Sequence, residues 1–263
     1  MTCTRNALIA GALALCVAFA SCLPHARDAL VVGMELSYPP FEMTDEEGRP
    51  CGVSIDLAKA LGEHLGRRVL IENIAFEGLI ASLKTGKIDL VISSMTATAE
   101  RTQSVDFSDP YLRTGLCLLV RKDSPLQSIA DADQPGRTIA AKKGTTGHTW
   151  AAAHVTQARV LVLDKEAACV LEVVQGKADA FIYDQMSVFK HWQRNPDTTR
   201  ALLKPFQEES WAVAVNKGNP ELLRQVNAFL RDFRERGGFE QLGDHWLREQ
   251  KEAFRKLGYP FYF

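Results

Sequence analysis

The sequence predicts an α/β fold, because strand-like apolar runs alternate with helix-like segments along the chain. Residues 30–34 are predicted to form a strand, residues 54–66 a helix, and residues 69–72 the next strand. We expect Ser54 to cap the start of the helix and Gly66 to follow its end. At 263 residues, the chain suits one large domain or two modest ones.

The composition excludes several classes of partner. Hydrophobic residues make up 46% of the chain, charged residues 24%, and the formal net charge is −1. This balance is typical of a globular protein and provides no basic field for nucleic acid or anionic lipid, so we expect neither as a partner. The cysteines have no metal-like or disulfide-framework spacing, and we expect neither a metal nor a cofactor.

Residues 1–22 are predicted to be a secretory signal peptide. Arg5 precedes an apolar run over residues 7–20 that is too short to span a bilayer as a helix. Cys22 follows two small residues, as at a lipoprotein cleavage site, although Phe19 replaces the usual aliphatic residue. We therefore expect a periplasmic protein that is lipid-anchored to a membrane through Cys22. Simple cleavage nearby, which would release a free periplasmic protein, is the alternative.

The chain contains an internal repeat. Residues 79–92 resemble residues 170–183, since each is a helix stopped by glycine, then Lys-x-Asp, then a buried strand. The first copy is followed by Ser93 and Ser94 and the second by Asp184. Ligands of open α/β sheets collect beyond the carboxyl ends of strands. We therefore expect two similar lobes that face each other across a ligand cleft.

A carboxylate-binding site is predicted after the first copy. Ser93, Ser94 and Thr96 form a hydroxyl-rich turn, and Arg101 follows five residues after Thr96. Hydroxyls and backbone N–H groups are directional donors, and a guanidinium group is a permanently charged fork that fits a carboxylate. The alternative is a surface arginine beside its neighbour Glu100.

A second candidate for anion binding is the segment 138–147. It is predicted to be a strand, a glycine turn and a helix that begins near Thr146. Free N–H groups at the start of a helix attract anions, so Thr145 and Thr146 are candidate ligand contacts. Plain helix capping by a threonine is the alternative, and both roles can hold together.

Several ordered motifs together resemble the polar amino-acid solute-binding proteins of ABC importers, over residues 30–247. These motifs are Ser37-Tyr38-Pro39-Pro40-Phe41-Glu42, Gly52-Val53-Ser54-Ile55-Asp56-Leu57, Leu79-Ile80 with Gly86-Lys87-Ile88-Asp89, Thr98-Ala99-Glu100-Arg101, and Val105-Asp106-Phe107-Ser108-Asp109-Pro110-Tyr111. The resemblance implies a two-lobed periplasmic-binding-protein fold of type II with two hinge strands. It further implies a free L-amino acid as ligand and an ABC permease of the inner membrane as partner.

The same resemblance implies how the chain is divided. Lobe 1 combines residues 29–112 with residues 211–263, and lobe 2 comprises residues 113–210. The two hinge crossings belong to lobe 2 and fall near residues 113–115 and 207–210.

The resemblance also implies roles for individual side chains. Arg101 and the Gly-Thr-Thr turn of lobe 2 would bind the ligand α-carboxylate. Asp184 would accept the α-ammonium group, with capping of the following helix as the alternative. Tyr38 and Phe76 would sandwich the apolar stem of the ligand.

Glu35 and Lys142 bear on which amino acid binds. Relatives keep an acidic residue at the place of Glu35, and alone it would favour arginine, lysine, ornithine or histidine. Glutamine-binding relatives carry a lysine at the place of Lys142. An acceptor beside a donor suits a side-chain amide better than a second cation, so we expect glutamine slightly ahead of arginine, lysine and histidine. Solvent exposure of both groups, or a salt bridge between them across the closed cleft, is the alternative.

Two other functions remain open. The same fold hosts rare dehydratases, and a carboxylate in a closed, dry cleft can act as an acid or base. We nevertheless expect no enzyme, since no nucleophile triad, Cys–His pair, metal motif or phosphate loop stands out. Sensor modules of this fold normally continue into a transmembrane helix and a signalling domain. The residues after Leu247 suggest neither, so we expect a freestanding, monomeric binding protein.

Overall fold

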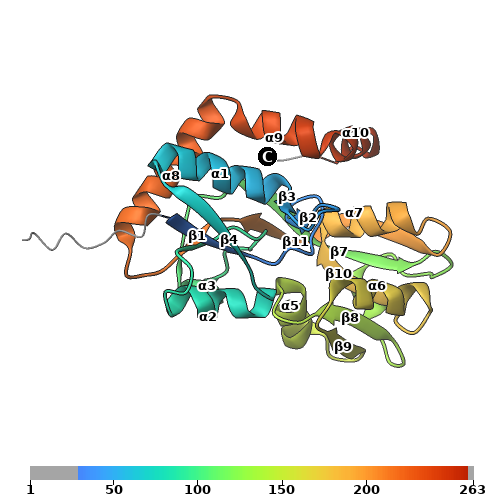
Figure 1. Ribbon diagram of the computed structural model, residues 1–263. Coiled ribbons are helices and arrows are strands. Elements are labelled where there is room, and N and C mark those ends of the chain that lie inside the picture. The colour runs from blue at the N-terminus through green and yellow to red at the C-terminus, as the bar shows by residue number, and fades with distance from the viewer. Residues whose placement is uncertain (1–28, 260–263) are drawn as a thin grey trace, which may run out of the picture.

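The computed structural model describes residues 29–259, which form two β-sheets flanked by helices (Figure 1). The predicted signal peptide and Cys22 lie outside the described residues. Among residues 29–259, no helix combines the length and apolarity needed to cross a membrane.

The first sheet has the strand order β4-β1-β5-β12-β6. Its strands are β1 (Ala29–Met34), β4 (Arg68–Asn73), β5 (Leu90–Val91), β6 (Asp106–Phe107) and β12 (Ala214–Val215). β1 pairs in parallel with β4 and β5, whereas β12 is antiparallel to β5 and β6. The strands expected at residues 30–34 and 69–72 are therefore confirmed, and they lie next to each other in the sheet.

The second sheet has the order β11-β7-β10-β8-β9. Its strands are β7 (Leu112–Arg121), β8 (Thr138–Lys142), β9 (Arg159–Leu163), β10 (Ala180–Asp184) and β11 (Thr199–Trp211). β8, β9 and β10 are parallel, and β7 is antiparallel to both β10 and β11. A small antiparallel pair, β2 (Met43–Thr44) and β3 (Pro50–Cys51), lies apart from both sheets.

The helices fall into two groups, one for each sheet. In the first sheet's part of the chain they are α1 (Val53–Leu65), the 3₁₀ helix η1 (Phe76–Gly78), α2 (Leu79–Lys84), α3 (Ala99–Thr102), α8 (Pro220–Glu235), α9 (Gly238–Trp246) and α10 (Arg248–Leu257). Beside the second sheet they are α4 (Ile129–Ala132), α5 (Thr146–His154), α6 (Glu166–Val174) and α7 (Gln185–Arg194).

The start of α1 differs from the prediction. Gly52 precedes the helix with φ 121°, and no side chain caps it. The expected cap, Ser54, instead lies inside the first turn, where it is buried and its hydroxyl donates to Glu42 Oε2 at 2.6 Å. Gly66 follows the helix in the left-handed conformation, as predicted.

The two copies of the internal repeat adopt the same local structure. Asp89 accepts a hydrogen bond from the backbone N–H of Val31 at 2.9 Å, and Asp179 accepts one from that of Thr138 at 2.8 Å. In each copy the carboxylate of the Lys-x-Asp motif thus binds the neighbouring parallel strand, β1 or β8. The repeated sequence therefore serves the same strand-pairing purpose in both sheets.

Two long strands connect the sheets. β7 follows β6 of the first sheet, and β11 leads into β12 of the same sheet. They pair with each other, with Leu112 opposite Trp211 and Gly115 opposite Glu208. A Cβ at Gly115 would lie 2.5 Å from the carbonyl oxygen of Gln207, so the close approach of the two strands requires glycine there.

The C-terminal helix α10 lies beside α7 of the second sheet's helices (Figure 1). Phe254 of α10 is 1% exposed, and its ring centroid lies 5.1 Å from that of Phe189 in α7. The sequence did not indicate this contact, since it places α10 and α7 in different lobes. The C-terminal segment thus packs against both halves of the molecule.

We predict that Phe254→Ala lowers the free energy of unfolding by about 3 kcal/mol, because it removes a buried aromatic ring and leaves a cavity. Leu257→Ala on the same helix is the matched control, since Leu257 is 45% exposed and should change stability by no more than about 0.5 kcal/mol. Urea denaturation measures both. Equal effects of the two substitutions would contradict the role given to the Phe254–Phe189 contact.

Candidate functional site

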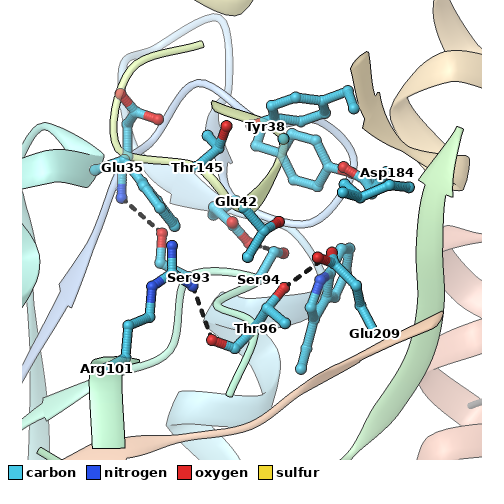
Figure 2. A pocket seen from close by; sticks show the side chains of 16 residues that line it. Glu35, Tyr38, Glu42, Ser93, Ser94, Thr96, Arg101, Thr145, Asp184 and Glu209 are labelled. Carbon is cyan, nitrogen blue, oxygen red and sulfur yellow. Dashed lines mark hydrogen bonds between the residues drawn. The ribbon is translucent and has the colours of Figure 1, made fainter. Parts of the chain in front are cut away.

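A pocket lies where the two sheets meet (Figure 2). All the side chains singled out from the sequence line it except Lys142, namely Glu35, Tyr38, Phe76, Ser93, Ser94, Thr96, Arg101, Thr145, Thr146 and Asp184. They come from loops, helix starts and strand ends beside both sheets. The structure therefore brings the predicted residues into one place.

Arg101 reaches the pocket from α3, whose first turn is capped by the Thr98 side chain. Its Nη1 donates to the carbonyl oxygen of Thr96 at 2.8 Å, and its Nη2 donates to that of Gly144 at 3.0 Å. Its Cζ lies 5.4 Å from the centre of the Phe76 ring. Because guanidinium has five N–H donors and two of them bind other residues of the range 29–259, three remain for a ligand carboxylate.

The hydroxyl-rich turn lies next to Arg101. Ser93 Oγ accepts a hydrogen bond from the backbone N–H of Glu35 at 3.0 Å, and Thr96 Oγ1 donates to Glu209 Oε2 at 3.2 Å. Ser94 has a φ of 46°, and its hydroxyl donates to Glu42 Oε2 at 3.1 Å. All three predicted hydroxyls thus point into polar surroundings at the pocket, not into the apolar core.

Asp184 lies opposite Arg101, at the end of β10 (Figure 2). Its Oδ1 accepts hydrogen bonds from the backbone N–H groups of Met186 and Ser187, at 3.0 and 3.1 Å, and thereby caps α7. The Tyr38 hydroxyl donates to the same oxygen at 2.6 Å. Among residues 29–259 these three bonds all end on Oδ1, so Oδ2 is available to a ligand. Capping and ligand binding are therefore compatible.

Burial raises the pKa of Asp184 to about 7, against the lowering effect of the Tyr38 and Ser187 hydrogen bonds. A cation placed beside Oδ2 would favour the ionised form and lower this pKa again. The site is thus suited to a positively charged group at this end.

Thr145 and Thr146 mark the start of α5. Thr145 caps the helix, since its Oγ1 accepts from the backbone N–H of His148 at 3.3 Å and donates to the carbonyl oxygen of Lys142 at 2.7 Å. The glycine turn and the helix that begins at Thr146 are as predicted. The capping role is observed for Thr145, while contact of either threonine with a ligand stays a prediction.

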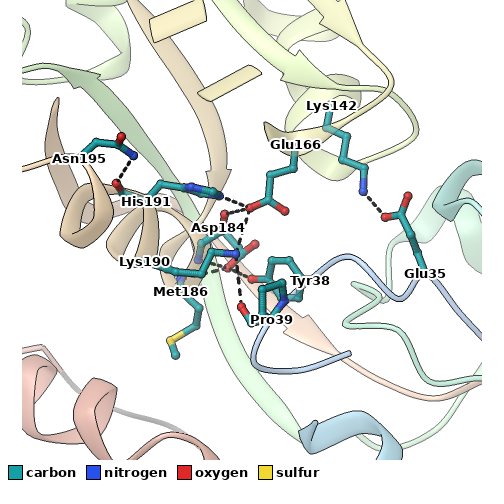
Figure 3. A network of polar contacts seen from close by, with 11 residues as sticks. Glu35, Tyr38, Pro39, Lys142, Glu166, Asp184, Met186, Lys190, His191 and Asn195 are labelled. Carbon is teal, nitrogen blue, oxygen red and sulfur yellow. Dashed lines mark hydrogen bonds and ion pairs between the residues drawn. The ribbon is translucent and has the colours of Figure 1, made fainter. Parts of the chain in front are cut away.

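Lys142 does not line the pocket but lies beside it and pairs with Glu35 (Figure 3). The lysine side chain is 3% exposed, and its Nζ lies 5.6 Å from the centre of the Phe76 ring. This salt bridge across the pocket is the alternative that the sequence left open for the two residues. It places a donor and an acceptor side by side with no net charge.

The sequence missed several pocket residues. Glu42, Leu116, Gly147, Tyr183, Glu209 and Trp211 also line the pocket. Burial raises the pKa of Glu42 to about 8, against the lowering effect of hydrogen bonds from Ser54 and Ser94, and burial likewise raises the pKa of Glu209. Glu42 is the last residue of the motif that begins with Ser37-Tyr38, and its place in that motif could have identified it. Glu209 carries no local signal.

A second polar cluster supports Asp184 and Tyr38 from behind (Figure 3). Glu166 Oε1 contacts Ser187 Oγ and His191 Nε2 at 2.5 Å and Lys190 Nζ at 3.4 Å. Burial alone would raise the pKa of Glu166, but the His191 hydrogen bond and the Lys190 charge outweigh it and lower the pKa to about 2. Lys190 Nζ also lies 5.2 Å from the centre of the Tyr38 ring. The cluster therefore links α6 and α7 to the aromatic wall of the pocket.

No group of three or more His, Cys, Asp or Glu residues among those described is arranged to hold a metal ion. Cys51, Cys117 and Cys169 are free thiols, and the last two are buried.

The sequence and fold match known proteins. The model of the bacterial extracellular solute-binding proteins, family 3, matches residues 30–249. The chain is 28% identical to the L-cystine-binding protein TcyJ of Escherichia coli, over 84% of this chain and 83% of that protein. It is 31% identical to the L-arginine-binding protein of Pseudomonas aeruginosa, over 92% of this chain and 96% of that protein.

Among solved structures, the ancestral amino acid-binding protein AncCDT-1, a precursor of cyclohexadienyl dehydratase, superposes with a TM-score of 0.78. The two are 35% identical, and the match covers 84% of this chain and 95% of that one. The two-lobed α/β architecture inferred from the motifs is therefore confirmed.

The pKa of Glu42 predicts a pH dependence of stability. Between its ordinary value of 4.5 and about 8, the folded protein keeps a proton that the unfolded chain has lost. Stability should therefore fall as pH rises through this window, by up to about 1.4 kcal/mol per pH unit for this group. Glu42→Gln removes the titration, so its stability relative to wild type should improve steadily from pH 5 to pH 8 in urea denaturation. Parallel curves for the two proteins would contradict the assignment.

Proposed function

The chain belongs to the bacterial extracellular solute-binding proteins of family 3, and from that premise we propose that it binds one free polar L-amino acid between its lobes and delivers it to an ABC permease. Members of this family bind amino acids outside the cytoplasm and work with ABC permeases. We further propose that Cys22 carries a lipid anchor after signal cleavage, so that the protein works at a membrane surface.

The observation that carries the proposal is the opposed pair Arg101 and Asp184 in one pocket. Arg101 has donors left for an α-carboxylate, and Asp184 Oδ2 can accept an α-ammonium group. The two residues come from α3 and from β10, which belong to different halves of the molecule. A zwitterion that spans them would therefore hold the halves together.

The side chain of the ligand would lie toward Glu35 and Lys142. Because these two already neutralise each other, a cationic side chain would have to share Glu35 with a buried ammonium group. A side-chain amide offers an acceptor to Lys142 and a donor to Glu35 without net charge. We therefore propose glutamine as the preferred ligand, with arginine, lysine or histidine as the next candidates.

Binding would proceed by closure of the two lobes about β7 and β11. A ligand that contacts Arg101 and Asp184 together stabilises only the arrangement in which both are close. The shift toward that arrangement can be no larger than the difference in the ligand's affinity for the two arrangements.

A dehydratase-like enzyme is a second candidate. It is favoured by two buried carboxyl groups in the pocket, Asp184 and Glu42, whose pKa values of about 7 and 8 suit proton transfer near neutral pH. The similarity to a precursor of a dehydratase adds to this candidate. Since the family consists mainly of binding proteins, we place binding first.

The test of the proposed function is calorimetric titration of refolded, ligand-stripped protein with L-glutamine, L-arginine, L-lysine and L-histidine. We expect saturable binding, with glutamine tightest, because its amide matches the neutral Glu35–Lys142 pair. Binding of arginine or lysine without glutamine would overturn the preferred ligand, and no binding of any common amino acid or of L-cystine in the same titration would overturn the amino-acid assignment. Mass spectrometry of the incubated ligand should show it unchanged, whereas turnover would favour the enzyme.

We predict that Asp184→Asn weakens binding of the tightest amino acid by at least about tenfold, because it removes the charge that pairs with the α-ammonium group. Asparagine caps helices as well as aspartate does, so α7 should stay intact. Asp197→Asn is the control, since that side chain is 98% exposed. Unchanged affinity in Asp184→Asn at unchanged thermal stability would remove Asp184 from the site.

A further inference from the structure

We propose that Glu42 is a positioning residue of the ligand site, which holds Ser94 in a left-handed backbone conformation and thereby sets the direction of the hydroxyl-rich turn. The inference rests on the proposed function, because it assigns to Glu42 a part in amino-acid binding.

Ser94 has an unusual backbone conformation. Among residues 29–259 it is the one non-glycine residue with a positive φ, at 46°. In this region the Cβ of an L-residue approaches its own backbone too closely, so the conformation persists only where surrounding contacts hold it. Such residues concentrate at functional sites, and Ser94 lies between Ser93 and Thr96 on the pocket wall.

Glu42 supplies a side-chain hydrogen bond that holds Ser94. The Ser94 hydroxyl donates to Glu42 Oε2 at 3.1 Å, and the Ser54 hydroxyl donates to the same oxygen at 2.6 Å. Ser54 belongs to the first turn of α1 and is 1% exposed, as is Glu42 itself. The first turn of α1 therefore holds the Glu42 carboxyl group in place, and this carboxyl group in turn holds the Ser94 hydroxyl.

The backbone of Glu42 supports the other wall of the pocket. Its N–H donates to the carbonyl oxygen of Tyr38 at 3.0 Å, and its carbonyl oxygen accepts from the N–H of Tyr38 at 2.8 Å. One residue thus ties the aromatic wall, the start of α1 and the hydroxyl-rich turn together. Figure 2 shows Glu42 and Ser94 side by side between Arg101 and Asp184.

The charge of Glu42 is compatible with this position. An ionised carboxylate beside the α-carboxylate site would repel the ligand, whereas a neutral acid still accepts hydroxyl hydrogen bonds. The pKa of about 8 keeps Glu42 neutral at pH 7. The charged groups that act on it are Glu35 and Lys142 near the pocket, and a charge on Glu42 would in turn raise the pKa of Tyr111 and of Tyr183.

The experiment compares single and double variants by calorimetric titration with L-glutamine and L-arginine at pH 7. Glu42→Ala should weaken binding of the tighter probe at least about tenfold, because Ser94 loses its anchor and relaxes. The double variant Glu42→Ala with Ser94→Gly should recover most of this loss, because glycine adopts a positive φ without an anchor. Glu42→Ala with Ser93→Gly is the matched control and should recover nothing.

A second comparison does not require Glu42→Ala to fold. Ser94→Ala loses the hydrogen bond that holds the positive φ and should relax, whereas glycine adopts a positive φ without that bond, so Ser94→Ala should bind the probe more weakly than Ser94→Gly does. Equal binding by these two variants, or no recovery in the Glu42→Ala, Ser94→Gly double variant, would overturn the proposal.

Crystallography separates this inference from the proposed function. Ser94 should move to a negative φ in Glu42→Ala whether or not amino acids bind, and a retained φ near 46° would contradict the anchoring role. Failure of the wild-type protein to bind any common amino acid or L-cystine would contradict the proposed function alone.

Discussion

The architecture of the site depends on hydrogen bonds to buried ionisable groups where the two sheets meet. A charge withdrawn from water is costly unless an opposite charge or hydrogen bonds replace the lost hydration. Arg101 meets this requirement through the carbonyl oxygens of Thr96 and Gly144, and Asp184 through Tyr38 and the start of α7. Each set of partners includes a residue from the opposite half of the molecule. Electrostatics therefore favours the approach of the two halves even before a ligand is considered.

The sequence indicated those residues whose role depends on the residues next to them in the chain. Asp184 ends a repeated helix-strand unit and Thr145 precedes a helix, so local pattern was enough to place both near a strand end or helix start. The cap assigned to Ser54 failed because the entry to α1 is set by Gly52. Its φ of 121° brings the chain so close to Phe41 that a Cβ would lie 2.4 Å from that carbonyl oxygen. Contacts between distant segments thus overrode the capping preference.

Glu209 could not be identified from the residues next to it in the chain, because its role also depends on contacts with a distant segment. It lies on β11, a strand that pairs with β7, and nothing near it in sequence marks a ligand site. Its carboxylate accepts from Thr96, 113 residues earlier in the chain, and Trp211 forms an isolated bridge with the same residue. A connecting strand therefore contacts the hydroxyl-rich turn directly. A movement of β7 and β11 would then change the geometry of the carboxylate site directly, because no other element lies between β11 and the hydroxyl-rich turn.

The salt bridge between Glu35 and Lys142 sets a condition on any ligand. A side chain that enters between them must replace an ion pair in which Lys142 is almost fully buried. A second cation would satisfy Glu35 but leave Lys142 without a partner, and an unpaired buried charge costs more than the pair contributes. A second anion would do the reverse. Only a group that donates and accepts at once preserves both interactions, and a side-chain amide does so with its donor and its acceptor on separate atoms. Selectivity would then arise from what the site rejects as much as from what it holds.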